Sequence, residues 1–102
     1  MEISKSDWKL YRERIGQWQE RYMEKLLQKY IKLLSSPGHA SERFWELEKR
    51  IRRDKNHPGV IIELSKSQAI WDIVMLVKKK VIQLDDLEGF SEELIEEVKM
   101  KM

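Results

Sequence analysis

The segment AIWDIVMLVKKK, residues 69–80, decides the fold because it is unusually apolar and ends in three lysines. Extended back to Val60, the apolar region reads VIIELSKSQAIWDIVMLV and includes two acidic residues and one lysine. A membrane span needs about 20 mostly apolar residues, and each charge near its centre costs roughly 2.5–3.5 kcal/mol. The uncharged run from Ile73 to Val77 is much shorter than that. We therefore exclude a membrane span and predict a buried helix from about Pro58 to Lys80.

Apolar residues fall on two opposite sides of a helix built through this segment, and a helix of that kind is buried on both sides. We expect it to be the central helix of the fold. The lysines at its end stay in solvent and complement the partial negative charge of a helix C-terminus. One of the two apolar stripes consists of Val60, Leu64, Trp71, Val74 and Met75.

The N-terminal third of the chain predicts a long helix from about Lys5 to Ser35. Ser4 and Asp7 have the spacing of a capping box, in which two side chains satisfy free backbone N–H groups at the start of a helix, and Ser6 is the alternative cap. An apolar stripe then advances in steps of three and four residues and drifts further along. That drift indicates a globular helix with more than one neighbour rather than a strict coiled coil. The stripe begins with Trp8, Tyr11, Ile15, Trp18 and Tyr22.

Two breaks divide the middle of the chain. The first, SSPGHAS at 35–41, ends the long helix, and Ser41 is expected to cap a second helix over ERFWELEKRIRRD. So short a connection predicts an antiparallel pair of helices. The second break, KNHPGV at 55–60, contains Pro58, which suits the first turn of the central helix.

The C-terminal segment predicts two short helices. Asp85 is expected to start the first, which runs through Leu87 and ends at Gly89. Ser91 is expected to cap the second, EELIEEVKMK. No segment has the alternating pattern of a strand, apart from a weak candidate in KVIQL.

Composition agrees with a single helical domain over residues 1–102. The 102 residues are 41% hydrophobic and 37% charged, with only two prolines and four glycines to interrupt helices. The fold class is therefore all-α, a small helical bundle. The absence of cysteine excludes disulfides, thiolate zinc sites and cysteine nucleophiles. The N-terminal residues do not form a secretory signal, so a cytoplasmic location is expected.

Charge is segregated along the chain. Residues 1–80 carry a net charge of +7, and residues 81–102 carry −5. The acidic segment has three possible partners, namely the basic helices of its own chain, a second copy or another basic protein. Alternatively, its carboxylates favour helix N-termini, where the backbone dipole attracts negative charge.

Aromatic residues suggest the leading functional hypothesis. Four tryptophans and three tyrosines are many for this length, and such side chains serve cores and interfaces more often than ligand pockets. The long first helix extends past what one chain covers, so we expect a homodimer or another protein partner. The protein is then a helical adaptor or regulator, without enzymatic activity or cofactor, that packs an apolar face into a partner's groove. The expected interface residues are Trp8, Tyr11, Trp18, Tyr22 and Trp71.

Nucleic-acid binding is the alternative hypothesis. A basic segment, KRIRRDKNH at 49–57, follows Trp45 and carries five cations that suit phosphate contacts. Against this, Glu46 and Glu48 precede two of the arginines by four residues, the spacing of ordinary helix-surface ion pairs. The expected contacts in this alternative are Lys49, Arg50, Arg52, Arg53, Lys55, Lys78, Lys79 and Lys80.

Catalytic and metal sites find little support. His39 and His57 lie in predicted loops, and two histidines without cysteine do not make a metal site. The C-terminal glutamates include pairs four residues apart, Glu92 with Glu96 and Glu93 with Glu97, but no second helix with carboxylates completes a metal shell. No base or oxyanion hole for a serine nucleophile is evident.

Three stretches carry a resemblance. They are SDWKLYRERI with WQERYMEKL, SERFWELEKRI with DK and PGV, and VIQLDDLEGFSEEL, within residues 6–26, 41–60 and 81–94. In this pattern the chain resembles, over nearly its whole length, a group of small uncharacterised bacterial proteins, mostly from Firmicutes. Such proteins sometimes carry the label multidrug transporter, which this sequence does not support because no segment can span a bilayer. The resemblance implies no catalytic residues.

Overall fold

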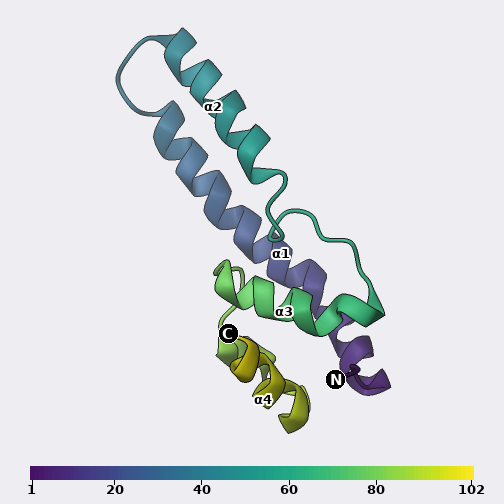
Figure 1. Cartoon of the computed structure of the whole chain (residues 1–102). Helices are drawn as coiled ribbons and strands as arrows, with labels where there is room; N and C mark the ends of the chain where they lie inside the picture. The colour runs from purple at the N-terminus through teal and green to yellow at the C-terminus, as the bar shows by residue number, and fades with distance from the viewer.

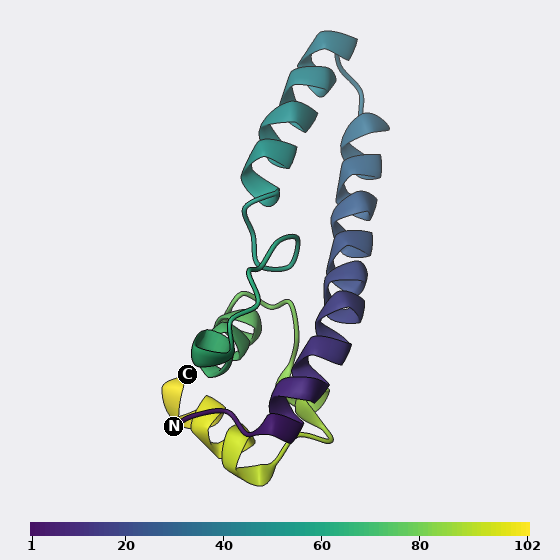
Figure 2. The same ribbon diagram turned by 90° about the vertical axis from the view of Figure 1, so that its right-hand side faces the viewer.

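The computed structural model describes residues 1–102 and confirms the all-helical fold class. The molecule is elongated, with extents of 52 × 23 × 22 Å. A hairpin of two helices extends from a small body that holds the other two, and the start of the first helix belongs to that body (Figures 1 and 2). The α-helices are α1, Lys5–Leu34, α2, Ala40–Asp54, α3, Ala69–Lys78, and α4, Glu92–Lys101; single turns of 3-10 helix span Lys66–Gln68 and Leu84–Leu87.

The hairpin of α1 and α2 confirms the predicted antiparallel pair (Figure 1). Ser4 caps α1 as predicted, because its hydroxyl accepts the backbone N–H of Asp7 at 3.1 Å. The reciprocal half of the capping box is absent, since the Asp7 carboxylate turns to Ser91 instead. The predicted cap of α2 is wrong: His39 occupies the cap position without a side-chain bond, and Ser41 lies inside the helix.

The predicted third helix is too long at its start. α3 begins at Ala69, and the chain from Lys55 to Ser65 has no regular structure. A turn replaces the expected helix start, with the backbone N–H of Val60 donating to the carbonyl of His57 at 2.8 Å. The β-branched residues that follow this turn favour an extended chain. That extended segment carries the backbone from the hairpin to the body (Figure 2).

This turn is fixed by contacts with α1. The His57 ring stacks on Tyr22 with centroids 4.6 Å apart and planes 6° from parallel. The same ring accepts the backbone N–H of Gly59 through Nδ1 at 3.0 Å. A methyl group on Gly59 would overlap the Tyr22 ring, so only glycine allows so close an approach of the backbone. These contacts oppose a helix through Pro58.

The core lies in the body. α3 is its central helix, as predicted, although Trp71 and Met75 are exposed, so the expectation that both apolar sides are buried is wrong for the stripe that contains these two residues. Val60 and Leu64 do not share a helical stripe with α3, because they lie in the extended segment. The buried cluster consists of Ile3, Tyr11, Ile15, Trp18, Ala69, Ile70, Ile73, Val74, Leu76, Val81, Ile82, Leu87, Phe90, Leu94 and Val98.

The acidic C-terminal segment docks on the basic first helix of its own chain. The Arg21 guanidinium donates to both carboxylate oxygens of Asp86, at 3.1 and 2.9 Å. Arg14 donates to the backbone carbonyls of Asp86 and Glu88. Asp86 also lies in the first turn of the 3-10 helix Leu84–Leu87. The acidic segment therefore both docks on a basic helix of its own chain and places a carboxylate at a helix N-terminus. Ser91 caps α4 as predicted by accepting the backbone N–H of Leu94 at 3.2 Å.

Candidate protein-interaction surface

One broad side of the hairpin is apolar and uncovered. We call this surface the hairpin face and define it by Met23 and Leu27 of α1, Phe44, Leu47 and Ile51 of α2, and Val60. A groove of about 350 Å³ runs between the two helices. A second hollow of about 390 Å³ lies along α2 and shares Ile51 with the groove. The two hollows therefore form one continuous surface.

Three side chains of the hairpin face are exposed to solvent over roughly half of their surface. The exposed fraction is 51% for Leu27, 61% for Phe44 and 44% for Ile51. Ile31 and Leu34 extend the exposed apolar row along α1 toward the hairpin tip. Single exposed apolar residues are common, whereas a contiguous patch marks a site of interaction.

Apolar packing within the chain contributes little to holding α2. Its only buried residue is Asp54, and no residue of α2 belongs to the core cluster. Beyond Trp18, where α1 leaves the body, the sole buried apolar residue of α1 is Leu26. Isolated helices of this length are marginal in water, and tertiary packing normally supplies their stability. The hairpin therefore has an apolar surface and little core beneath it.

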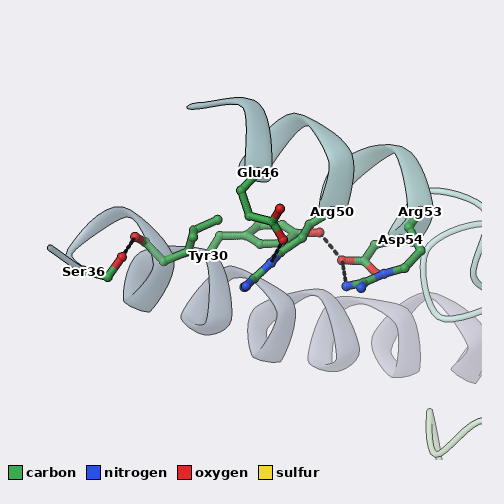
Figure 3. Close-up of polar contacts among 7 residues, drawn as sticks. Tyr30, Ser36, Glu46, Arg50, Arg53 and Asp54 are labelled. Atoms are coloured by element: carbon green, nitrogen blue, oxygen red, sulfur yellow. Dashed lines mark hydrogen bonds and ion pairs between the residues drawn. The ribbon is translucent and has the colours of Figure 1, made fainter. Parts of the chain in front are cut away.

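A polar network joins the two helices at the groove, which Tyr30 and Asp54 also line (Figure 3). The Tyr30 hydroxyl donates to Asp54 at 2.6 Å, and Arg53 Nε donates to the same carboxylate at 3.0 Å. Burial acts to raise the pKa of Asp54, but the hydrogen bonds from Arg53 and Tyr30 outweigh it and lower that pKa. Burial and the bond to Asp54 raise the pKa of Tyr30 to about 12, so its hydroxyl remains a donor at neutral pH.

Charged side chains border the groove on opposite walls. Glu20 and Glu24 come from α1, and Lys55 follows the end of α2. None of these three takes part in an ion pair within the chain. Asp54 shares the wall of Lys55, but its carboxylate pairs with Arg53. The unpaired charges of the groove are therefore acidic on the α1 wall and basic on the opposite wall.

The aromatic residues expected at an interface divide into two groups. Tyr11 and Trp18 are buried in the core, where Trp18 lies 6.2 Å from the Phe90 ring. Trp8 and Tyr22 pack against the same core and are partly buried. Trp71 has 55% of its surface exposed, with the Lys101 ammonium 4.8 Å from its ring centre. Of the five, Trp71 alone is largely accessible to a partner.

The basic residues of the nucleic-acid hypothesis are partly engaged. Arg50 pairs with Glu46 at 3.1 Å, Arg52 pairs with Glu48, and Arg53 pairs with Asp54. The other candidates, Lys49, Lys55, Lys78, Lys79 and Lys80, are exposed. The pairs made by Arg50 and Arg52 are the helix-surface ion pairs that the four-residue spacing predicts. Arg53 pairs instead with the residue that follows it.

Neither a membrane span nor a metal cluster is found in the structure. No helix has both the length and the apolar composition to cross a bilayer. No group of three or more His, Asp or Glu side chains is placed to bind a metal ion. The chain is thus an all-helical protein with a helical hairpin set on a small core. Comparisons with known protein families, curated proteins and solved structures give no match.

The turn at His57 gives a prediction for the effect of pH. Burial and the charge of Lys79 lower the pKa of His57 below 6.5, against the opposite influence of Asp54. As the pH falls, the unfolded chain therefore binds this proton before the folded protein does. The stabilisation from neutral His57 is fully present well above pH 6.5, the ordinary pKa of histidine, and is lost as the pH falls through that value. We expect the melting temperature to fall between about pH 7.5 and about pH 5.5.

Two variants isolate this contribution. His57→Phe keeps an aromatic ring on Tyr22 and removes the titrating group, so thermal melts should show a weaker pH dependence. His39→Gln removes the exposed histidine of the hairpin loop and should retain the wild-type dependence. An equal dependence in the wild type and in His57→Phe would contradict the assignment.

Proposed function

We propose that this chain is a small helical interaction protein, an adaptor or regulator that acts by packing its hairpin face against another protein. The observation that carries the proposal is that no apolar side chain of α2 is fully buried in its own chain. Phe44 and Ile51 project from this helix into solvent. A folded helix with an uncovered apolar side is expected where a partner protein binds and covers that side.

The energetics favour a covered hairpin face. Apolar surface removed from water contributes roughly 25 cal/mol per Å². The face therefore gains stability only when another surface replaces the water over Leu27 and Ile51. The contact would be made by packed helices, with apolar anchors at the centre and charged residues at the rim.

The test compares two variants that each place a lysine at an exposed apolar position. Ile51→Lys changes the hairpin face, and Met100→Lys changes α4 outside it. Each is used as tagged bait in cells of the source organism, which also contain the untagged protein. We expect the wild type and Met100→Lys to retain the same protein or proteins, and Ile51→Lys to lose them. Identical retention by all three baits would reject the hairpin face as the site of interaction.

A further inference from the structure

We propose that the occupant of the hairpin face is a second copy of this chain, and that the two hairpins form a four-helix bundle. This inference rests on the proposed function and names its partner. Two-helix hairpins with apolar faces complete a core when they pair, and closed two-fold dimers are the commonest oligomers. The first argument comes from the charges beside the groove.

The groove is electrostatically complementary to itself. Glu20 and Glu24 line its α1 wall, whereas Asp54 and Lys55 line the opposite wall, where Arg53 neutralises Asp54 and leaves Lys55 as the unpaired charge. A two-fold axis that runs along the groove places α1 of one copy over the end of α2 of the other. The acidic wall then meets the basic wall twice, once on each side of the axis. A different protein would need the same alternation of charge, whereas a second copy has it by symmetry.

The direction of the helices also suits this arrangement. α1 and α2 are antiparallel within one hairpin (Figure 1). With the axis along the groove, α1 of one copy lies beside α2 of the other, so every neighbouring pair in the bundle is antiparallel. Antiparallel neighbours joined by a short connection are the usual topology of four-helix bundles.

The body does not block the approach. Trp18 of α1 points into the core of the body. Leu27 is nine residues further along, and nine residues make two and a half turns of an α-helix. Leu27 therefore points away from the side that carries α3 and α4, and the hairpin faces can meet with both bodies on the outside. The exposed Trp71 lies on α3 and takes no part in this contact.

Sedimentation of the purified full chain is the first test. We expect a dimer at tens of micromolar for the wild type and for the control Met100→Lys. Ile51→Lys is expected to raise the dissociation constant by at least about 10-fold, because a lysine ammonium in an apolar interface loses its hydration. A monomeric wild type would overturn the inference, as would a dimer that Ile51→Lys leaves unchanged.

Disulfide trapping supplies a second test that does not depend on how well Ile51→Lys folds. The chain has no cysteine, so single substitutions introduce unique thiols. In the proposed dimer Glu24 lies opposite the partner's Lys55 and not opposite its own counterpart. Mixed under oxidising conditions, Glu24→Cys and Lys55→Cys should form a mixed disulfide dimer in higher yield than either variant gives alone. Equal yields in the mixture and in the separate samples would contradict the axis along the groove.

The outcomes separate the inference from the proposed function. If sedimentation shows a monomer while the bait retains a different protein through Ile51, the second copy is the wrong occupant and the interaction surface is right. If the bait retains neither a second copy nor another protein through Ile51, both proposals fail.

Discussion

Replacing Leu76 by Ala is expected to lower the free energy of unfolding by about 2–5 kcal/mol. Leu76 is fully buried on α3 and belongs to the core cluster at the centre of the body. Alanine removes apolar contacts and leaves a cavity that a close-packed core fills only in part. Domains of this kind have a total stability of about 5–15 kcal/mol, so the loss would be a large share.

The neighbouring residue provides the control. Met75 occupies the adjacent position on the same helix, with 38% of its surface exposed. Met75→Ala should therefore cost much less than Leu76→Ala. Urea unfolding followed by circular dichroism measures both, at one fixed protein concentration so that any self-association contributes equally. Similar losses in the two variants would show that α3 is not the centre of the core.

Replacing Asp7 by Ala is expected to lower the free energy of unfolding by about 1–3 kcal/mol. The buried Asp7 carboxylate accepts the backbone N–H of Ser91 at 2.9 Å and the Ser91 hydroxyl at 2.5 Å. It therefore fastens the start of α4 to the start of α1. Removing it leaves a partly buried backbone donor without its partner at the cap of a helix, and an unmade bond of that kind is costly.

A double-mutant cycle separates this bond from other effects of the substitution. Ser91→Ala removes the hydroxyl from the same contact, and the two changes together should cost less than the sum of their separate costs. Glu13→Ala, which changes an exposed carboxylate of α1, should alter stability by no more than about 0.5 kcal/mol. Strict additivity of Asp7→Ala and Ser91→Ala would contradict coupling between the two side chains.

Much of the fold is predictable from local pattern. The three- and four-residue steps along α1, the Pro-Gly break after it and the cap at Ser91 each depend on residues close in sequence. The start of α3 was mispredicted because its cause is a contact between distant segments. The His57 ring stacks on Tyr22 and holds a turn where Pro58 alone favours a helix start.

The candidate site is less predictable for a related reason. The sequence shows that Phe44, Leu47 and Ile51 share one side of a helix, and that pattern is the same for a covered face and an exposed one. Only the three-dimensional structure reveals that Phe44 and Ile51 stay exposed. The apolar stripe of α1 has the same ambiguity. Its pattern predicted Tyr11 and Trp18 as interface residues, but both side chains are buried in the core of their own chain.

Amide hydrogen exchange of α2, measured as a function of protein concentration, tests most directly whether a partner supports this helix. We expect its amides to become more protected as the concentration rises from about 1 µM to about 100 µM, because dimer formation follows mass action. The amides of α3 lie in the core of a single chain and should show far less change. Protection of α2 that equals that of α3 and does not change with concentration would contradict the account, because the hairpin would then be stable without a partner.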